Sequence, residues 1–256
     1  MVTWNPKQYL KFAEERSRPC RDLIGRIALE MPGRIVDLGC GPGNSTAALV
    51  ERWPVADITG VDNSADMIAA ARGAYPRQQW IEADISSWKA AAPVDLIFSN
   101  AALQWVGDHA RLLPELMRML NPSGALAVQM PANYYTATAQ QLIRELAGSG
   151  PWRDKFPDEI RRWHCDEPDF YYGVLQGVSR KLDIWTSEYL HILNSPEDIV
   201  HWYIGTSLRP YLDILPAADR ENFIAAYQNL ITAGYPKQSD GRVLFPFRRL
   251  FFVAYR

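Results

Sequence analysis

Apolar runs alternate with helical stretches along residues 34–130, and this alternation limits the possible folds more than any other feature of the sequence. The expected strands lie at 34–39, 57–62, 79–84, 94–100 and 125–130. The expected helices lie at 45–53, 64–75 and 109–120. Short apolar strands that alternate with helices are typical of a parallel sheet covered by helices on both faces, with right-handed crossovers.

The alternation ends after Met130. We expect a helix at 136–148, an irregular segment at 149–172, a strand at 181–193 and a last strand at 249–256. Residues 196–235 have a helical pattern and are too long for a simple connection. The sequence therefore predicts an α/β fold: a doubly wound, Rossmann-like, mostly parallel seven-stranded sheet with a helical cap inserted before the last strand. The expected parts are an N-terminal helical segment that closes the site at 1–30, the α/β domain at 31–195 and 236–256, and the cap at 196–235.

The composition is that of an ordinary globular chain, with 48% hydrophobic and 22% charged residues among 256. A net charge of −2 argues against a nucleic-acid-binding surface. No apolar run approaches the roughly 18 residues that a membrane-spanning helix needs, and the N-terminus has no signal-peptide core. Cys20, Cys40 and Cys165 form no disulfide or zinc motif. We expect a cytoplasmic monomer without metal, membrane or nucleic-acid partners.

A glycine-rich turn, within VDLGCGPGNST at 36–46, lies between the first expected strand and the first expected helix. Glycine permits positive φ and close approach of a ligand to the backbone. A P-loop would need a lysine that reaches the phosphates, and no lysine is near. A dinucleotide fingerprint would have its third glycine at position 44, which is Asn44. The turn therefore predicts a ligand site of another kind.

Polar side chains lie at the ends of the next expected strands: Asp62, Asp84 and Asn100. Open α/β sheets bind their ligands at the carboxyl ends of parallel strands, where a carboxylate such as Asp62 can accept hydrogen bonds from both hydroxyls of a ribose. An acid at a strand end is a helix N-cap about as often. The combination with the glycine turn favours a nucleoside-type ligand.

The pattern DLGCGPG, in which Asp37 precedes three alternating glycines, resembles motif I of the class I S-adenosylmethionine-dependent methyltransferases. The resemblance implies S-adenosylmethionine as cofactor, S-adenosylhomocysteine as product and no metal. It also implies that Asp84 receives the adenine amino group, with Ile85 following through its backbone, and that Asn100 begins a substrate-facing loop. The implied cofactor-binding residues are Asp37, Gly39, Cys40, Gly41, Asn44, Asp62, Asn63, Met67, Asp84, Ile85 and Asn100.

Longer stretches, including ITGVDNSADMI, DLIFSNAALQWV, GTSLRPYL and FPFRRLFFVAYR, are similar to the trans-aconitate methyltransferases within this family. The resemblance implies a carboxyl O-methyltransferase that forms a monomethyl ester of trans-aconitate, a small tricarboxylate. A carboxylate is already ionised at neutral pH, since its reference pKa is about 4. We therefore expect positioning residues and no catalytic acid or base. Three alternatives stay open: a methyltransferase for another small acceptor, a nicotinamide-dependent dehydrogenase, and a non-catalytic protein that binds S-adenosylmethionine.

The N-terminal stretch offers candidates for binding an anionic substrate. Tyr9 and Arg16 fall on one face of an expected helix that Asn5 and Pro6 would begin. Arg18 precedes a proline and is expected outside the helix, at a turn. Guanidinium groups bind carboxylates bidentately. The alternative is a solvated helix end in which these arginines pair with neighbouring glutamates.

Arg209 is a further candidate, because it precedes a proline in an aromatic neighbourhood and needs a partner there. An ion pair within the protein is the alternative. Trp105 and Tyr172 complete the expected substrate-binding set. Packing is an equally good interpretation of Trp105, and a tyrosine pair such as Tyr171 and Tyr172 more often packs. Arg248 and Arg249 are interpreted as surface charge flanking the last strand. Substitution of Arg16, Arg18 or Arg209 by Ala is expected to raise KM.

Overall fold

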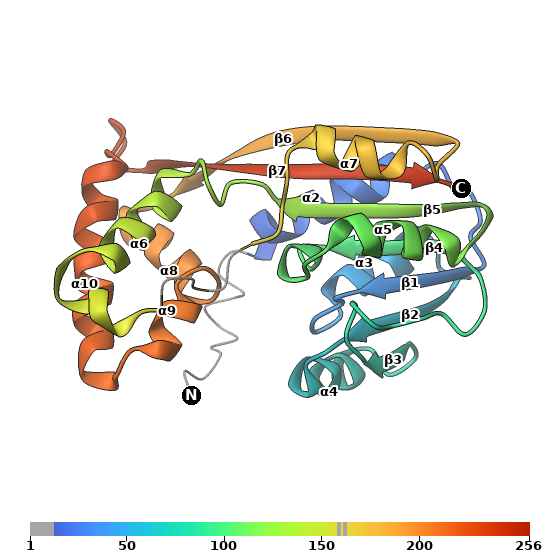
Figure 1. The fold of residues 1–256 in the computed structure, drawn as a ribbon, viewed down its shortest axis with the longest axis horizontal. Coiled ribbons are helices and arrows are strands. Elements are labelled where there is room, and N and C mark those ends of the chain that lie inside the picture. Colours follow the sequence, from blue (N-terminus) through green and yellow to red (C-terminus); the bar gives the residue numbers. More distant parts are fainter. Residues whose placement is uncertain (1–12, 158–159, 161–162) are drawn as a thin grey trace. The chain divides into compact units, whose positions relative to one another are not determined.

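The structure of the protein is a computed structural model that describes residues 13–157, 160 and 163–256, without the side chains of residues 13, 14 and 16. Its strands are β1 (Arg34–Leu38), β2 (Asp57–Asp62), β3 (Gln79–Glu82), β4 (Val94–Asn100), β5 (Leu120–Pro131), β6 (Lys181–Leu193) and β7 (Val243–Tyr255) (Figure 1). The helices of the first half are α2 (Ala13–Arg26), α3 (Asn44–Arg52), α4 (Ala65–Ala74), η1 (Leu103–Trp105) and α5 (His109–Arg118). The later ones are α6 (Thr138–Gly148), η2 (Gly150–Lys155), α7 (Pro168–Leu175), α8 (Pro196–Ile204), α9 (Arg209–Ile214) and α10 (Ala217–Gly234).

Within the described residues, the strands form one seven-stranded sheet in the order β3-β2-β1-β4-β5-β7-β6. Strands β1 to β5 run parallel to one another, and β7 is antiparallel to β5. The strand order reverses at β1, between β2 and β4. This is the doubly wound, mostly parallel sheet that the sequence predicts. Such a reversal is where open α/β sheets bind their ligands.

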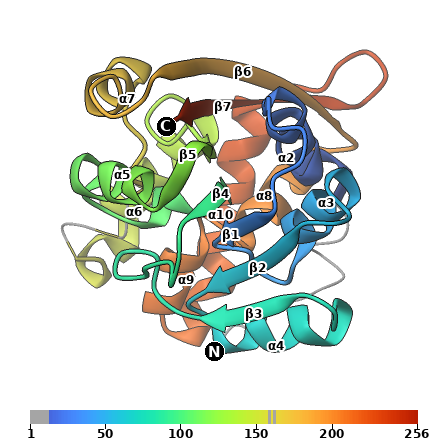
Figure 2. The ribbon, with the colours of Figure 1, turned by 90° about the vertical axis from the view of Figure 1, so that its right-hand side faces the viewer.

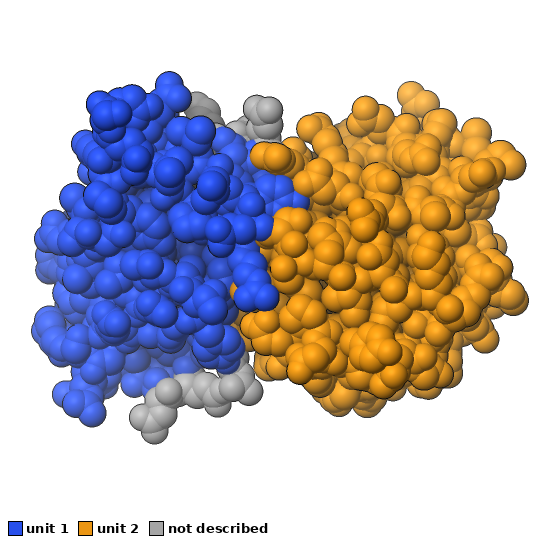
Figure 3. All heavy atoms as spheres, turned by 90° about the horizontal axis from the view of Figure 1, so that it is seen from above, with its two compact units in different colours: residues 1–15, 133–162, 188–248 blue, residues 16–132, 163–187, 249–256 orange. Residues whose placement is uncertain are grey.

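The chain forms two compact units, which Figure 3 colours separately. Unit 2 consists of Arg16–Ala132, Trp163–Ser187 and Arg249–Arg256. It contains β1 to β5, the first part of β6 and the last part of β7. Unit 1 consists of Met1–Glu15, Asn133–Arg162 and Glu188–Arg248.

In unit 2, helices cover both faces of the sheet. Seen along the sheet, α2 and α3 lie on one face, and α5 and α7 lie on the other (Figure 2). The face toward α5 and α7 is closed by a buried apolar cluster to which sheet and helices both contribute, including Val36, Ile97, Leu113, Tyr171 and Phe252. Burial of this kind stabilises a domain by about 25 cal/mol for each Å² of apolar surface.

In unit 1, α10 packs against α6 and α8. Two tyrosines of this unit hold α6 by its backbone at Ala139. The Tyr227 hydroxyl donates to the Ala139 carbonyl (3.0 Å), and the Tyr235 hydroxyl accepts from the Ala139 N–H (3.1 Å). Residues 133–162 therefore belong to the same compact unit as the expected cap at 196–235. The expected domain boundaries placed them in the α/β domain.

Several expected elements differ from the structure. The segment 149–172 is not wholly irregular, since it contains η2 and the start of α7, whose Tyr171 and Leu175 are fully buried. Arg18 does not lie at a turn, because α2 continues through Pro19. The buried residues Cys20, Leu23 and Ile24 follow in that helix, and their packing outweighs the local preference of the residue before a proline.

Candidate active site

The glycine turn joins β1 to α3 in a left-handed conformation. Gly39, Gly41 and Gly43 have φ of +76°, +53° and +95°. The N–H groups of Gly39 and Cys40 both donate to the carbonyl of Val61, at 2.7 and 3.0 Å. These bonds fix the turn against the end of β2.

The three glycines differ in what surrounds them. A Cβ atom on Gly39 would lie 2.0 Å from Cβ of Ala102, and one on Gly43 would lie 2.7 Å from the ring of Tyr75. A Cβ on Gly41 would meet nothing within 4 Å. Gly39 and Gly43 are therefore required by packing as well as by φ. Gly41 borders open space in which a ligand can approach the backbone.

Asp37 lies beneath this turn with no exposed surface. Its Oδ2 accepts hydrogen bonds from the hydroxyls of Ser45 and Thr46, both at 2.7 Å. Burial raises the pKa of Asp37 to about 6, against the lowering effect of these two bonds. Asp37 therefore holds the start of α3 and places a buried negative charge under the turn. The other oxygen, Oδ1, is buried without a hydrogen-bond partner among the described residues, and the cofactor contact that the resemblance implies for Asp37 stays a prediction.

Two other members of the expected cofactor set are also buried. The Cys40 side chain packs with Ile68, Ala71 and Trp80, and burial raises the pKa of its thiol far above the ordinary value. Ile85 is 8% exposed and belongs to the apolar cluster of the sheet. Any contact of Cys40 with a ligand would therefore involve its backbone.

Asp62, at the end of β2, is half-buried and faces the glycine turn. Its Oδ2 accepts the N–H of Gly41 and its Oδ1 accepts the N–H of Ser64, both at 2.9 Å. The N-cap of α4 is Ser64, whose hydroxyl oxygen accepts from Met67. Asp62 is therefore not the helix cap, and each carboxylate oxygen retains a lone pair for a further donor.

Asp84 follows β3 in a tight turn. Its Oδ1 accepts both the N–H and the hydroxyl of Ser86, at 2.8 and 2.6 Å. These two bonds lower the pKa of Asp84, and a hydrogen bond from the Asn63 side chain lowers it further. The loops after β2 and β3 are thus linked, and the exposed Asp84 carboxylate stays ionised.

The loop after β4 has a strained start. Ala101 has φ of +55°, a left-handed conformation that a residue with a Cβ rarely adopts. It is held there by two bonds, from the Ala101 N–H to the Gln129 carbonyl (2.9 Å) and from Gln104 Nε2 to the Ala101 carbonyl (2.7 Å). The Asn100 Oδ1 is buried and has no hydrogen-bond partner among the described residues. Strain and an unpaired buried acceptor at one strand end are typical of a functional loop.

A buried pair that the sequence analysis did not identify supports this loop. His109 Nε2 lies 3.0 Å from the Leu103 carbonyl, so it carries the proton and donates, while Nδ1 accepts from the Tyr171 hydroxyl (3.0 Å). The same hydroxyl accepts the N–H of Asp166 (3.2 Å). Burial lowers the pKa of His109, which keeps the ring neutral. Because His109 and Tyr171 are 62 positions apart, no local pattern could have paired them.

The expected substrate-binding residues are only partly placed. Tyr9 and the side chain of Arg16 lie outside the part of the chain that the structure describes. Arg18 and Tyr172 are exposed, and Trp105 packs edge-on against Trp163 at 5.9 Å.

Arg209 matches the alternative interpretation given for it, and Arg249 differs from its expected place. Arg209 has its Nε 3.6 Å from Oδ2 of Asp213, with both side chains about half exposed, so the ion-pair alternative describes its surroundings. Arg249 is only 4% exposed and donates to Gln129 Oε1 (3.4 Å), which corrects its interpretation as surface charge. The reason is that β7 begins at Val243, which places Arg248 and Arg249 inside the strand.

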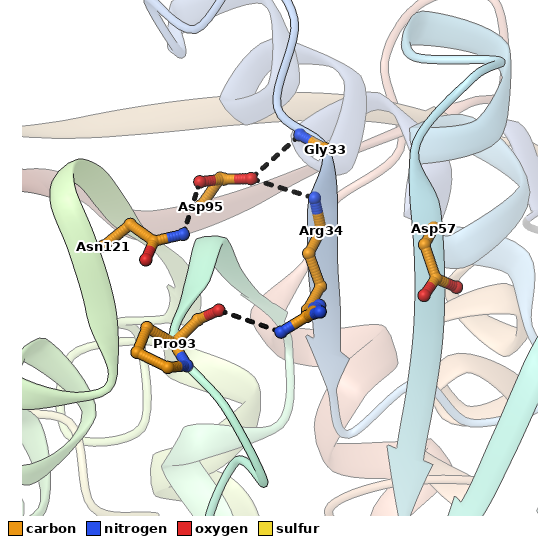
Figure 4. Close-up of a pocket in the computed structure, with 6 residues that line it drawn as sticks. All are labelled: Gly33, Arg34, Asp57, Pro93, Asp95 and Asn121. Atoms are coloured by element: carbon orange, nitrogen blue, oxygen red, sulfur yellow. Dashed lines mark hydrogen bonds between the residues drawn. The ribbon is translucent and has the colours of Figure 1, made fainter.

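A polar hollow of about 460 Å³ lies at the opposite, amino ends of the strands (Figure 4). Asp95 lines it and accepts hydrogen bonds from the N–H groups of Gly33 and Arg34 and from the Asn121 amide. Both Asp95 oxygens therefore already have protein donors. Ligands of open α/β sheets bind at the carboxyl ends, so we assign this hollow a structural role.

Two features are absent from the described part of the chain. No group of three or more His, Cys, Asp or Glu side chains is placed there to hold a metal ion. No helix there is both long and apolar enough to cross a membrane.

Comparison with known proteins gives a family for the whole chain. Residues 35–124 match the "Methyltransferase domain" family. The chain is 49% identical to the trans-aconitate 2-methyltransferase of Azoarcus sp. (strain BH72) over 256 residues, covering 100% of both chains. It is 45% identical to that of Escherichia coli O157:H7, covering 100% of this chain and 99% of the relative. This chain belongs to the trans-aconitate 2-methyltransferase family. The family resemblance expected from the sequence is confirmed.

Solved structures agree at the level of the fold. The YcgJ protein from Bacillus subtilis has a TM-score of 0.61 at 14% identity, covering 93% of this chain and 98% of that one. A putative methyltransferase from Bacillus halodurans has a TM-score of 0.59 at 12% identity, with the same two coverages. At these identities the likeness shows the α/β fold alone.

Proposed function

We propose that the protein is an S-adenosylmethionine-dependent carboxyl O-methyltransferase that forms a monomethyl ester of trans-aconitate. The observation that carries this proposal is the full-length similarity to relatives that bear that name, at 44–49% identity. A match over the whole chain includes both compact units, and so it extends beyond the cofactor domain that methyltransferases of many kinds share.

The residues present fit the cofactor. The open space beside Gly41 leaves the backbone of the turn accessible. Asp62 has lone pairs for two ribose hydroxyls, and Asp84 has an oxygen left over from its turn for the adenine amino group. The unpartnered Asn100 Oδ1 calls for a donor. We assign the holding of S-adenosylmethionine to the backbone of the glycine turn and to these three side chains, with Asn44, Asn63 and Met67 beside them.

When bound, S-adenosylmethionine supplies a methyl group on a cationic sulfur, and its transfer to a carboxylate oxygen gives the ester and S-adenosylhomocysteine. The protein does not need to remove a proton, because the acceptor is ionised at neutral pH. The neutral His109 supports this interpretation, since both of its ring nitrogens are used in holding the loop after β4. The chain's own residues therefore align the acceptor and exclude water.

The acceptor must be held by its other carboxylates. A guanidinium that gripped the reacting carboxylate tightly would lower its nucleophilicity, so cations belong on the groups that do not react. Tyr9, Arg16 and Arg18 stay candidates for this task, together with Trp105 and Tyr172. Arg209 is a weaker candidate because its guanidinium already has Asp213 beside it.

A methyl-transfer assay tests the proposal. The purified protein is incubated with S-adenosylmethionine and, separately, with trans-aconitate, cis-aconitate, citrate, isocitrate or itaconate, and products are weighed by mass spectrometry. We expect a base-labile monomethyl ester from trans-aconitate, formed far faster than from the other acids. If S-adenosylhomocysteine binds but no ester forms, the proposed cofactor site is supported and trans-aconitate is contradicted as the substrate.

We further propose that the enzyme acts as a monomer in the cytoplasm and requires no nucleic acid. The absence of disulfides among the described cysteines supports a reducing compartment. Light scattering during size-exclusion chromatography should give the 29.1 kDa mass of one chain. A mass of two chains at assay concentrations would contradict the monomer.

A further inference from the structure

Arg144, in the middle of α6, is placed differently from other arginines of unit 1. It is half-buried, and its guanidinium lies over the rings of Tyr134 and Tyr135, at 5.0 and 5.9 Å from the ring centroids. Its Nη1 donates to the Tyr134 carbonyl at 2.6 Å.

The guanidinium of Arg144 has no acidic partner among the residues that the structure describes. The ion pairs found there, such as Arg209 with Asp213 and Arg242 with Asp240, do not include it. An arginine has five N–H donors, and one described hydrogen bond leaves most of them available. Partial burial against aromatic rings reduces hydration of the charge, so an anionic ligand would be bound more strongly than at the surface.

A second observation, on the segment that leads from β5 into α6, points to a ligand. Asn133 is 2% exposed, and neither its side-chain oxygen nor its side-chain nitrogen has a hydrogen-bond partner among the described residues. Its own carbonyl closes the turn by accepting from Ala137 (2.9 Å). Leaving a buried amide unpaired is unfavourable, so a donor or acceptor from a ligand would be stabilising.

Both residues belong to the same short stretch of unit 1. Asn133 directly precedes Tyr134, whose carbonyl and ring both contact Arg144. The stretch begins where the parallel strand β5 ends, at Pro131, and ligands of open α/β sheets bind at such carboxyl ends. Tyr211 of α9 is electrostatically coupled to Arg144: burial raises the pKa of Tyr211, and the Arg144 charge opposes this rise.

We propose that Arg144 and Asn133 form a carboxylate-binding site for a non-reacting carboxylate of the tricarboxylate substrate. This inference rests on the proposed function. The guanidinium would donate two parallel N–H bonds to the carboxylate, and the Asn133 amide would donate a third. Tyr134 and Tyr135 form the aromatic wall that holds the guanidinium in place.

The test compares two arginines of unit 1. Arg144→Gln removes the charge and the fork, and Arg144→Lys keeps only the charge. Arg220→Gln is the matched control, because Arg220 is also half-buried and also donates to a backbone carbonyl, that of Leu215 at 3.0 Å. Steady-state kinetics give KM for trans-aconitate, and calorimetry gives the Kd of S-adenosylhomocysteine for each variant.

We expect KM to rise about ten- to hundredfold in Arg144→Gln, the range for loss of a charged hydrogen bond, and less in Arg144→Lys. The Kd of S-adenosylhomocysteine should stay within twofold of wild type, and Arg220→Gln should behave as wild type. A KM unchanged in Arg144→Gln, with an active wild type, overturns the carboxylate site and leaves the function intact. If the wild-type protein neither binds nor methylates trans-aconitate, both the proposed function and the proposed carboxylate site are overturned.

Direct binding separates a contact from an indirect effect. Itaconate, glutaconate and mesaconate each lack a different carboxylate of trans-aconitate, and their Kd values are measured by calorimetry with S-adenosylhomocysteine present. For one of the three, wild type and Arg144→Gln should bind equally, because the carboxylate that Arg144 grips is missing. An equal loss of affinity for all three acids would show that Arg144 acts only on the shape of the site, and would overturn the proposal.

Discussion

At the scale of single residues, Asp37 carries a charge that folding removes from water. Burial raises its pKa from 3.8 to about 6, so the folded protein binds a proton more tightly than the unfolded chain. The stability that this group contributes is therefore complete below pH 3.8 and is lost as the pH rises through about 6. The ionised Asp37 carboxylate lies under the glycine turn, where it attracts a cationic ligand. The loss of stability therefore accompanies a gain in ligand binding.

We predict that Asp37→Asn raises stability at pH 7, by on the order of 3 kcal/mol, since one pKa unit corresponds to about 1.4 kcal/mol. The Asn oxygen can still accept from Ser45 and Thr46. As the pH rises from 4 to 7, the calorimetric Tm of Asp37→Asn should fall less steeply than that of wild type. The same variant should bind S-adenosylhomocysteine, which carries an ammonium, about tenfold more weakly.

The control for this prediction is Asp57→Asn, at the exposed start of β2. It should leave both the pH profile and the affinity near wild type. Parallel Tm profiles for Asp37→Asn and wild type would show that the buried carboxyl is not the group that titrates.

Substitution of single glycines in the turn distinguishes those that packing requires from the one beside which a ligand approaches. Gly41→Ala should cost about 1–2 kcal/mol, because φ is +53° but no atom lies near the new Cβ. It should weaken S-adenosylhomocysteine at least tenfold by filling the space beside the turn. Gly39→Ala should cost far more stability, because its Cβ would meet Ala102 at 2.0 Å. Thermal unfolding and calorimetry measure the two effects.

Gly73→Ala is the control, since Gly73 lies in α4 with ordinary φ and nothing within 4 Å. It should raise stability by up to about 1 kcal/mol and leave affinity unchanged. If Gly41→Ala bound the ligand as wild type does, the turn would not be where the cofactor approaches.

At the scale of elements, the strands that carry the site could be predicted from the sequence, because apolar runs mark buried parallel strands strongly. The expected strands at 57–62, 94–100 and 181–193 match β2, β4 and β6 to the residue. Once the order of β1 to β4 follows from the doubly wound fold, Asp62, Asp84 and Asn100 must lie at one edge of the sheet. That much of the cofactor site is a consequence of topology.

The remaining elements depend on contacts that are distant in sequence. Helix α7 is short, begins with Pro168 and is stabilised by burial of Tyr171 against the sheet, which no local periodicity reveals. The surroundings of Arg144 also could not be predicted from local periodicity. Arg144 is followed by Glu145 and resembles an ordinary solvated helix position in the sequence. Only the fold places it against two tyrosine rings.

The His109–Tyr171 pair makes a prediction about the loop after β4. Tyr171→Phe removes the hydroxyl that joins Asp166 to His109, and should cost about 1–2 kcal/mol of stability. Because the loop then loses its support, KM for trans-aconitate should rise severalfold while the Kd of S-adenosylhomocysteine stays unchanged. Kinetics and calorimetry give the two constants.

Tyr255→Phe serves as the control, because the Tyr255 hydroxyl also accepts a backbone N–H, from Ala28 at 2.8 Å. A similar loss of stability without a change in KM is expected there. Equal changes in KM for the two variants would mean that the effect of Tyr171 is one of general stability.

At the scale of the whole molecule, the two units are interleaved along the chain, and this is where the sequence analysis reached least far. The helical pattern at 196–235 identified part of unit 1, which also includes residues 133–162 and 188–195. Hydrophobic periodicity detects helices but not which helices pack together. The bonds of Tyr227 and Tyr235 to Ala139 decide the membership of α6.

The division of roles between units predicts a pattern of hydrogen exchange. S-adenosylhomocysteine should slow amide exchange at 38–46 and 61–67, where the turn and Asp62 lie. Trans-aconitate added afterwards should slow exchange at 133–144, around Asn133 and Arg144. Mass spectrometry of peptides measures both steps. Protection of 133–144 by S-adenosylhomocysteine alone would contradict this division.

The most direct test of the account is a competition for methyl groups in a single tube. Trans-aconitate, cis-aconitate, citrate, isocitrate and itaconate are mixed at equal concentrations with the enzyme and S-adenosylmethionine, and each monomethyl ester is quantified by mass spectrometry. The ratio of esters gives the ratio of kcat/KM values directly. We predict that the ester of trans-aconitate exceeds every other ester by at least tenfold. An excess of any other ester, or a methylated product that base does not hydrolyse, would contradict it.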